Sequence, residues 1–372
     1  MQVFANLCDP HSFMRSIMKS GETYNIAACN FFEGVSINPG LLKTAFPNNP
    51  ITVPVTGHSV FAKMFIDYIQ MHASSQMSGD YRKFIEFFNV SGKLLFSIGF
   101  KADPYSTGSD VQPLGLYSWN DDGSLKTSKF DTTGLYPMAL LTNYSSRTPD
   151  RALSFNYFND PNDLNNSKFD VYYGGEKILS MSGAELGTHA DHDPAVLYFF
   201  RNTLNKDSAS SYRHRVSYIV VTDTLDLTLE PLVLKPNALI SSVDFTGVVT
   251  DIADTLQDAN YISCSAEVGK YIEFSLKKGS SNFKAMNSGG DLVGGVMSFY
   301  GRYLQIGGVS VTFTITIFNG GQIYYSEDVV VPANQDNSYY QTMLLNAISS
   351  ALNGLSAKNI LSYTVRIELK GV

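Results

Sequence analysis

The sequence predicts a mainly β protein in which β-sandwich or jelly-roll-like domains follow a helix-bearing N-terminal region. Three observations predict this class. Apolar residues alternate with polar ones over several long segments, glycine pairs stand between such segments, and helical spacing of apolar residues is confined to a few short stretches. The chain has 372 residues, of which 44% are apolar, so it can bury substantial cores.

The first hundred residues are expected to mix helix with strand. Asp9 and Pro10 offer an N-cap and an N1 proline to a helix over residues 11–19. Ser59 offers a cap to a second helix, whose apolar face would consist of Val60, Phe61, Met64, Phe65 and Tyr68. Residues 94–99 place Leu, Phe and Ile at alternate positions, which predicts a strand.

A polar stretch follows at residues 102–137, where Gly, Ser, Asp and Thr become frequent. It contains a strong turn signal at Asn120–Gly123, whose sequence is Asn-Asp-Asp-Gly. We therefore expect this stretch to form a long excursion over the surface of the protein.

Beyond residue 150 the apolar pattern has a period of two, which is typical of strands. Residues 153–157 alternate in this way, and Gly174-Gly175 separates two runs within residues 169–181, which predicts a β-hairpin. Val216–Val221 is an apolar-rich run that flows into alternation over Leu225–Leu229. One face of that segment is expected to be buried and the other exposed to solvent.

Two prolines mark the expected domain boundary. Pro231 and Pro236 are expected to interrupt regular structure, and the segment between them is the best candidate for a junction. The sequence thus predicts a helix-bearing and β-rich N-terminal region, residues 1–235, and a C-terminal β-sandwich domain, residues 236–372.

The C-terminal part has the clearest strand patterns. Residues 309–331 alternate on both sides of Asn319-Gly320-Gly321, which predicts a second hairpin. Residues 340–352 show helical spacing of apolar side chains, with Gly354 at a C′ position. Residues 361–370 alternate almost to the end of the chain and predict a strand inside a sheet. Its core-facing side chains would be Leu361, Tyr363, Val365, Ile367 and Leu369.

Composition points to assembly. Charged residues make up only 16% of the chain, against a typical share of about 25%, while aromatic residues make up 13%. A surface so short of charge either relies on Ser, Thr, Asn and Tyr for solubility or is covered by other subunits. The net charge is −7 and no run of Lys or Arg occurs at either end, which argues against nucleic-acid binding through a basic arm, so no direct sequence-specific nucleic-acid binding is expected.

The sequence also bears on location. No stretch approaches the ~20 consecutive apolar residues of a membrane-spanning helix, so no membrane span is expected. Residues 1–10 lack the basic start and the long apolar run of a signal peptide. Synthesis in a cytoplasm is therefore expected.

One segment, His189-Ala190-Asp191-His192-Asp193-Pro194, gathers side chains that can bind a divalent metal. His and Asp both suit a borderline cation such as zinc, so the candidate ligands are His189, Asp191, His192 and Asp193. The alternative is a polar loop in which Asp191 or Asp193 caps a turn and the histidines are solvated. A bound metal would be structural, because no general base, oxyanion donor or nucleophile stands beside the cluster.

Motifs for catalysis and cofactor binding are missing. Residues 57–61, Gly-His-Ser-Val-Phe, lack the second glycine of a nucleophile elbow. The Gly-Lys pairs at residues 92–93 and 269–270 lack the upstream glycine of a phosphate-binding loop. The sequence therefore predicts a protein that is not an enzyme and that holds no cofactor other than the structural metal considered above.

These features together make the chain resemble virion structural proteins of viruses and phages in composition and β-pattern. The resemblance implies a virion location and a capsid (shell) subunit that assembles with itself and with other virion proteins through apolar and aromatic interfaces. A tail or fibre receptor-binding protein is the alternative, with exposed Tyr, Trp119 and Asn loops contacting a host sugar. From other classes, a carbohydrate-binding module and a divalent-metal hydrolase using His189, Asp191 and His192 stay open.

Overall fold

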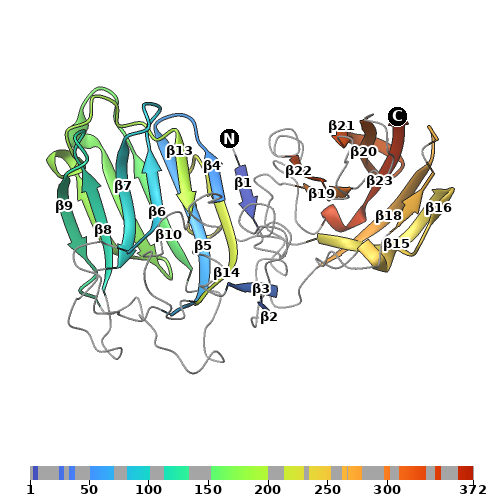
Figure 1. Cartoon of the computed structure of the whole chain (residues 1–372), viewed down its shortest axis with the longest axis horizontal. Helices are drawn as coiled ribbons and strands as arrows, with labels where there is room; N and C mark the ends of the chain where they lie inside the picture. The colour runs from blue at the N-terminus through green and yellow to red at the C-terminus, as the bar shows by residue number, and fades with distance from the viewer. Residues whose placement is uncertain are drawn as a thin grey trace. The chain divides into compact units, whose positions relative to one another are not determined.

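The chain folds into two compact units, which we call unit 1 (Met1–Leu229) and unit 2 (Glu230–Val372). Their junction lies a few residues before the one predicted at residues 235 and 236. The computed structural model describes residues 3–6, 25–28, 33–37, 51–70, 82–100, 113–133, 152–199, 213–229, 234–252, 262–265, 267–278, 297–301, 310–331, 340–344 and 359–371. Both units are built mainly from β-strands in these residues, which confirms the predicted mainly β class but not the predicted helix-bearing N-terminal region (Figure 1).

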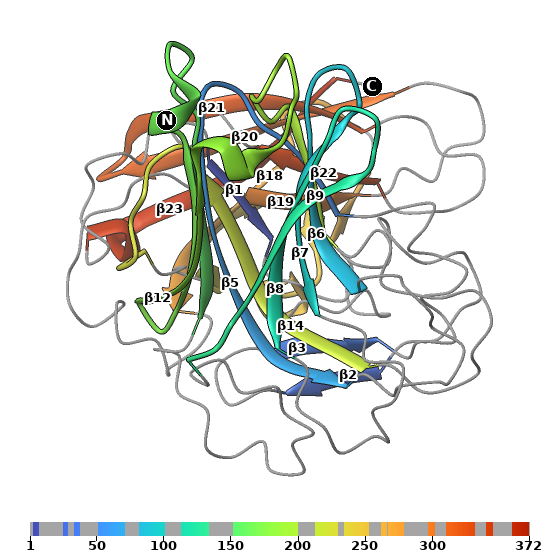
Figure 2. The same ribbon diagram turned by 90° about the vertical axis from the view of Figure 1, so that its left-hand side faces the viewer.

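Unit 1 contains two antiparallel sheets. The larger sheet consists of β1 (Val3–Asn6), β2 (Asn25–Ala28), β3 (Glu33–Ile37), β5 (Ser59–Gln70), β10 (Leu153–Phe158), β11 (Lys168–Tyr173), β12 (Glu176–Ser182) and β14 (Arg213–Thr222). The smaller sheet consists of β4 (Ile51–Pro54), β6 (Arg82–Phe88), β7 (Leu94–Phe100), β8 (Leu114–Trp119), β9 (Leu125–Phe130) and β13 (Val196–Phe199). Figure 2 shows β5 and β14 as long neighbouring strands of the larger sheet.

The order of strands mixes local and distant pairings. The larger sheet has the order β12-β11-β10-β5-β14-β3-β2, with β1 paired to β14, and the smaller has the order β4-β13-β6-β7-β8-β9. The meanders β6 to β9 and β10 to β12 connect sequence neighbours, whereas β5 pairs with β10 and β14, and β13 with β4 and β6. Because the chain crosses between the sheets, loops from distant parts of the sequence come together at their ends.

An aromatic core holds the two sheets of unit 1 face to face. Phe87 of β6 makes edge contacts with Phe155 and Phe169 of the larger sheet, with ring centroids 5.2 and 5.0 Å apart. Phe96 of β7 contacts Phe169 and Tyr157 at 5.2 and 4.7 Å. All five rings are fully buried. Such edge-on aromatic pairs add to the free energy of area burial and make this core the main support of unit 1.

The second predicted helix is wrong. Residues 59–70 form strand β5, which lies between β10 and β14 in the larger sheet. Val60, Phe61, Ala62 and Met64 are all buried, so successive side chains on both faces of the strand are covered. A strand buried on both faces is a continuous apolar run, and such a run also contains the spacing of a helix. The predicted helix at residues 11–19 lies outside the described residues.

The predicted surface excursion is also wrong over much of its length. Residues 114–130 form the hairpin β8–β9, and every residue of β8 is buried. Leu114 and Leu116 supply its apolar packing, and the Ser118 hydroxyl donates a hydrogen bond to the backbone oxygen of Glu185. A buried strand can contain polar residues when their side chains have hydrogen-bond partners, as Ser118 does. The polar composition of this stretch therefore did not mean that it lies on the surface. The turn at Asn120–Gly123 is confirmed by a hydrogen bond from Gly123 N to Asn120 O.

The two predicted glycine hairpins are confirmed. Gly174 and Gly175 join β11 to β12, and Gly320 and Gly321 join β20 (Val311–Asn319) to β21 (Gln322–Val331). All four glycines have a positive φ between 57° and 85°. A two-residue hairpin loop of this kind needs positive φ at both central positions, which glycine adopts without strain.

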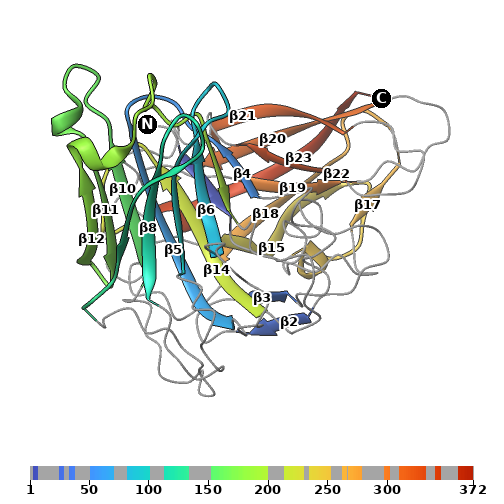
Figure 3. The ribbon, with the colours of Figure 1, turned by 60° about the vertical axis from the view of Figure 1, so that its left-hand side comes forward.

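Unit 2 is built on a five-stranded antiparallel sheet with the order β15-β18-β23-β20-β21. Figure 3 shows these strands from β21 to β15, from top to bottom. Besides β20 and β21, this sheet contains β15 (Leu234–Val243), β18 (Tyr271–Lys278) and β23 (Tyr363–Gly371). Unit 2 also contains two small antiparallel pairs. They are β16 (Phe245–Thr246) with β17 (Ser263–Cys264), and β19 (Met297–Gly301) with β22 (Tyr340–Leu344).

The predicted terminal strand is confirmed as β23, which lies inside the sheet between β18 and β20. Its side chains Tyr363, Val365 and Leu369 are buried, and Ile367 packs against the core. Leu361 precedes the strand, in a short 3₁₀ helix at Asn359–Ser362. One face of the sheet carries the core of unit 2, which consists of Val249, Ile272, Phe274, Ile315, Ile317, Val329, Tyr363 and Val365.

Two further predictions in unit 2 need correction. A helix was predicted over residues 340–352, but residues 340–344 form strand β22, which pairs along its full length with β19. Residues 345–352 lie outside the described residues. Pro236 does not end regular structure but lies within the edge strand β15, where the register shifts between Pro236 and Leu239. An edge strand tolerates proline because one side of its backbone needs no ladder partner.

The helices in the described residues are short 3₁₀ turns: Leu164–Asn166, Gly183–Leu186, Val249–Ile252 and Asn359–Ser362. Over these same residues, none of the helices has the length and apolar character needed to cross a membrane.

The opposite face of the unit 2 sheet carries a polar network. Thr364 donates to one carboxylate oxygen of Glu273 at 2.7 Å, and Arg366 donates to the other from Nη2 at 2.8 Å. The Arg366 guanidinium also lies over the rings of Tyr271 and Phe318, 4.3 and 4.9 Å from their centroids. Burial by itself would raise the pKa of the Glu273 carboxyl, but these hydrogen bonds and the Arg366 charge outweigh burial, so the pKa is lowered.

We expect Glu273→Gln to destabilise unit 2 by about 2 kcal/mol at pH 7, the usual size for hydrogen bonds to a charged group. The lowered pKa means that the folded form binds its proton less readily than the unfolded chain. The stabilisation is therefore complete above about pH 4.5, the ordinary value for glutamate, and is lost as the pH falls through the lowered pKa. Thermal unfolding of both proteins from pH 7 to pH 3 should show the gap closing; a constant gap would contradict this.

Candidate functional site

Five loops of unit 1 are tied together by polar contacts at one end of its sandwich. They are residues 55–58 before β5, 89–93 between β6 and β7, 120–124 between β8 and β9, 159–167 between β10 and β11, and 187–195 before β13. We call them the loop cluster. Loops held by a rigid sandwich are where such folds carry recognition sites, so the loop cluster is the candidate functional site.

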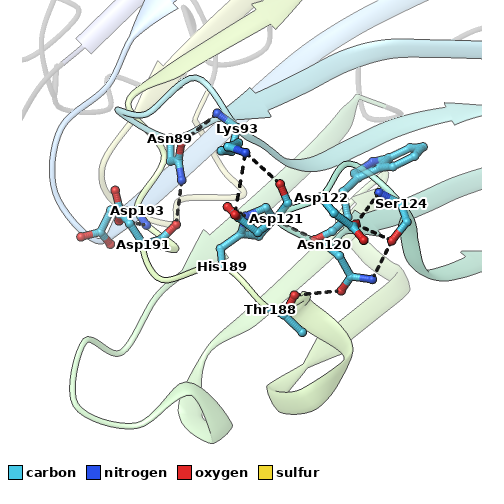
Figure 4. Close-up of polar contacts among 11 residues, drawn as sticks. Asn89, Lys93, Asn120, Asp121, Asp122, Ser124, Thr188, His189, Asp191 and Asp193 are labelled. Carbon is cyan, nitrogen blue, oxygen red and sulfur yellow. Dashed lines mark hydrogen bonds and ion pairs between the residues drawn. The ribbon is translucent and has the colours of Figure 1, made fainter.

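Loop 187–195 contacts the other four loops, and Figure 4 shows its contacts with loops 89–93 and 120–124. Asn89 donates from its amide to the backbone oxygen of Asp191 at 3.0 Å, and Thr188 donates to the side-chain oxygen of Asn120 at 3.2 Å. The backbone of Ala195 bonds to Val55 at 3.0 Å. The position of each loop therefore depends on this one segment, which also contains all four predicted metal ligands.

Asp191 and Asp193 form a capped turn. The Asp191 carboxylate accepts a hydrogen bond from the backbone N–H of Asp193 at 2.9 Å, which closes an Asx turn. A turn capped by an aspartate is what the sequence offered as the alternative to a metal site. The Asp193 carboxylate oxygen Oδ1 lies 2.8 Å from Nδ1 of His58 and accepts from the Asn159 amide at 2.7 Å. Asp193 thereby connects three loops through one of its two carboxylate oxygens.

His189 is not solvated but fully buried. Its Nε2 lies 2.7 Å from the backbone oxygen of Trp119, and because a carbonyl oxygen only accepts, Nε2 carries a proton. Its Nδ1 has no hydrogen-bond partner in the described part of the chain and lies 3.5 Å from a carboxylate oxygen of Asp121.

His192 packs edge-on against His189, with ring centroids 5.7 Å apart. Burial lowers the pKa of His192, the neighbouring His189 lowers it further, and Asp191 and Asp193 act in the opposite direction without reversing the shift. The lowered pKa favours the neutral form of the His192 imidazole. Its backbone oxygen accepts a hydrogen bond from the Tyr157 hydroxyl at 2.9 Å, which anchors the loop on β10.

The four predicted metal ligands do not converge on a common point. Among the described residues, no group of three or more His, Cys, Asp or Glu side chains is placed to hold a metal ion. The two aspartates form the turn and its links to neighbouring loops, while the two histidines pack against each other. The geometry gives the metal site no support, and it stays a prediction that elemental analysis of the purified protein would test.

The exposed part of the loop cluster carries charged and polar groups beside the apolar side chain of Val90, which is 80% exposed. Lys93 donates to the backbone oxygen of Asp121 at 3.0 Å and lies 3.7 Å from its carboxylate, and both side chains are about half exposed. Asp122 accepts two hydrogen bonds from Ser124, and these lower the pKa of its carboxyl. The surface therefore offers fixed hydrogen-bonding groups of both charges to a partner.

Trp119 does not offer an exposed stacking surface, contrary to the expectation for a fibre protein. It is only 9% exposed, its indole N–H donates to the Ser97 hydroxyl at 3.1 Å, and the Lys83 amino group lies 3.9 Å from the ring centroid. The ring is thus already covered and offers no stacking surface to a partner of the loop cluster.

Several residues of the loop cluster were missed by sequence reasoning. Asn89, Lys93 and Asp121 lie on turns between strands, and nothing in their local sequence links them to residues 187–195. They come together because β6, β7 and β8 are neighbours in the smaller sheet and β13 pairs with β6. The Asn120–Gly123 turn was recognised, but only as a turn.

We expect Gly187→Ala to destabilise unit 1 by about 2 kcal/mol or more and to disorder the loop cluster. Gly187 has a φ of +92°, which costs other residues about 1–2 kcal/mol, and a β-carbon there would lie 2.2 Å from the backbone oxygen of Trp119. That oxygen is the one that holds His189. Thermal unfolding and the His189 imidazole NMR signals check this.

Gly92→Ala is the matched control, because Gly92 also has a positive φ but has open space around the added carbon. It should cost only the strain of about 1 kcal/mol and leave the His189 signals unchanged. Equal effects of the two substitutions would contradict the close contact at Trp119.

No protein-family model matches the sequence, and no curated protein matches it. Among solved structures, the chain is similar to a β-glucanase of Bacillus licheniformis at 8% identity and a TM-score of 0.29, over 60% of this chain and 99% of that one. It is similar to the binding domain of botulinum neurotoxin serotype C1 at 9% identity and a TM-score of 0.33, over 94% of this chain and 92% of that one. Likenesses of this size establish no shared function.

Proposed function

We propose that the chain is a structural subunit of a virus or phage particle, a non-enzymatic shell protein that assembles with itself and with other virion proteins. The observation that carries the proposal is the exposed apolar surface of unit 2. Large aliphatic side chains are 40% or more exposed there at Leu239, Ile240, Val243, Val248, Val268, Ile323 and Val330. Leu239, Ile240 and Val243 lie within five residues of each other on the edge strand β15, and exposed apolar side chains grouped in this way mark an interaction site.

Unit 1 has fewer exposed apolar side chains than unit 2 among the described residues. Its large exposed apolar side chains in the described residues are Val90, Phe158 and Leu225, although unit 1 is the larger unit. We therefore assign assembly to unit 2 and leave the polar loop cluster of unit 1 free for other contacts. The virion setting itself rests on composition, because few charges are available to keep such a surface soluble as a monomer.

We expect the purified full-length chain to form a closed shell or a large ring, and we expect this assembly to persist at about 1 M salt. Salt at that concentration shortens the screening length to about 3 Å and weakens ion pairs, but it does not weaken apolar contact. Light scattering after size exclusion, with electron microscopy of the peak, measures both. A monomer at every concentration would overturn the proposal, and so would dissociation by salt alone.

A tail or fibre receptor-binding protein is the second candidate, and the loop cluster is the observation that favours it. Lys93, Asp121 and His58 are each about half exposed there and lie on loops fixed from several sides. Such a protein would be a trimer in the same experiment. A monomer would favour a carbohydrate-binding module or the divalent-metal hydrolase, and the second would also need a bound metal at His189, Asp191 and His192.

A further inference from the structure

A buried hydrogen-bond acceptor without a partner lies in the loop cluster. Nε2 of His189 donates to the backbone oxygen of Trp119, so in the neutral ring Nδ1 carries a lone pair and can only accept. The His189 side chain has no exposed surface, and its Nδ1 makes no hydrogen bond within the described part of the chain. Because nearly all buried polar atoms in folded proteins have partners, this exception calls for an explanation.

The unpartnered Nδ1 points toward a second acceptor. It lies 3.5 Å from Oδ1 of Asp121, whose side chain is 57% exposed (Figure 4). An ionised carboxylate only accepts, so no proton joins these two atoms while the imidazole is neutral. Lys93 does not fill the gap, because its amino group donates to the backbone oxygen of Asp121 and lies 3.7 Å from the other carboxylate oxygen.

The spacing of these two acceptors fits a shared donor. A nitrogen about 2.9 Å from each of two acceptors 3.5 Å apart makes ordinary hydrogen bonds to both. A metal ion suits the pair less well, since a zinc site takes three or four protein ligands. Among the described residues, no third His, Cys, Asp or Glu side chain is placed to complete such a site. The pair therefore calls for an N–H group from a ligand.

The charge around the pair selects a cationic ligand. The five loops of the loop cluster contain one lysine and six aspartates, a net charge of −5 with the histidines neutral, whereas the whole chain has a net charge of −7. The aspartates are Asp121, Asp122, Asp160, Asp163, Asp191 and Asp193. Hydrogen bonds from Ser124 lower the pKa of Asp122, and one from Asn166 leads those that lower the pKa of Asp160, which favours the charged carboxylates. Such a surface attracts cations over a distance.

Arginine combines the two requirements. Its guanidinium is a permanent cation, and its five N–H groups form a planar fork that can donate to two neighbouring acceptors at once. The ammonium of lysine is a compact point charge without this fork.

We propose that the loop cluster binds an arginine-containing basic segment of a partner protein, with one guanidinium donating to Nδ1 of His189 and to Oδ1 of Asp121. Asp121 is the exposed member of the pair, so the guanidinium meets it first. A change of rotamer of this surface side chain then admits the donor to Nδ1, and exposed side chains change rotamer readily. The interface goes beyond the proposed function, because it lies on unit 1 and requires no self-assembly.

Titration of the full-length chain with a fluorescent oligoarginine peptide at low salt tests the interface, with anisotropy as the readout. Asp121→Asn should raise the Kd about tenfold, the usual effect of losing a hydrogen bond between charged groups. Asp131→Asn is the matched control. It removes the same charge from the hairpin β8–β9, but Asp131 follows the end of β9 whereas loop 120–124 precedes its start. This control should change the Kd by less than about twofold.

Two further measurements separate the specific contact from attraction by net charge. Binding of the peptide to the wild type should shift the imidazole NMR signals of His189, and an oligolysine peptide of equal length should bind more weakly. Equal weakening by the two substitutions, unshifted His189 signals, equal binding of oligolysine, or displacement of the peptide by zinc would each overturn this interface. None of these results alters the light-scattering test of the proposed function, so the two can fail separately.

Discussion

Truncation after residue 362, which removes β23, is expected to leave unit 2 unfolded while unit 1 keeps its fold. β23 pairs with β18 on one side and with β20 on the other, so its loss separates β15 and β18 from β20 and β21. It also removes three buried side chains, Tyr363, Val365 and Leu369, worth about 1.5–3 kcal/mol each. That loss is comparable with the whole stability of a small domain, about 5–15 kcal/mol.

Calorimetry and limited proteolysis measure the effect separately for each unit. The truncated chain should lose one unfolding transition, and protease should digest residues after 229 while leaving the rest intact. Two valines provide a milder matched comparison: Val365→Ala in the core should lower the stability of unit 2, and Val330→Ala, which is half exposed, should change it little. A truncated chain with both transitions at their original temperatures would contradict the central position of β23.

The strands that could be predicted are those whose local sequence alone decides their conformation. The hairpins β11–β12 and β20–β21 have period-two alternation and a glycine pair that adopts positive φ, so turn, strand and register are all encoded within a few residues. β23 alternates in the same way, and its polar face carries Thr364 and Arg366. In each case one face of the sheet is more buried than the other, so apolar and polar side chains alternate along the strand.

The elements that could not be predicted are those whose environment comes from distant residues. Residues 60–64 of β5 are covered on both faces, so their sequence does not alternate, and the apolar spacing of the strand fits a helix equally well. β8 contains Gly115 and Ser118, which indicate a loop until the packing of neighbouring strands is known. These two strands lie in the interior of their sheets, where tertiary context overrides local preference.

The candidate site shows the same limit. The segment around His189 was recognised from its residue types, but residue types alone could not decide between a metal site and a polar turn. The decision depends on partners such as His58 for Asp193 and Trp119 for His189, which are distant in the sequence and are brought near by the order of strands. A cluster of metal-binding residue types therefore has to be judged by what else its side chains contact.

Phe169→Ala is expected to destabilise unit 1 by about 3–5 kcal/mol, the usual cost of removing a buried ring from a core. Phe169 is fully buried on β11 and contacts rings from both sheets, Phe87 and Phe96 on one and Tyr157 on the other. Its removal leaves a cavity where the two sheets meet, and the rigid neighbouring rings can close it only in part.

Phe158→Ala is the matched control, because Phe158 lies on the neighbouring strand β10 but is 37% exposed. It should change the stability of unit 1 by less than about 1 kcal/mol. Chemical denaturation, read from the transition assigned to unit 1, compares the two variants directly. Because Tyr157 also anchors His192 through its hydroxyl, the Phe169 cavity should loosen the loop cluster as well, visible as faster amide exchange at residues 187–195. Equal stability of the two variants would mean that the aromatic contacts between the sheets do not hold unit 1 together.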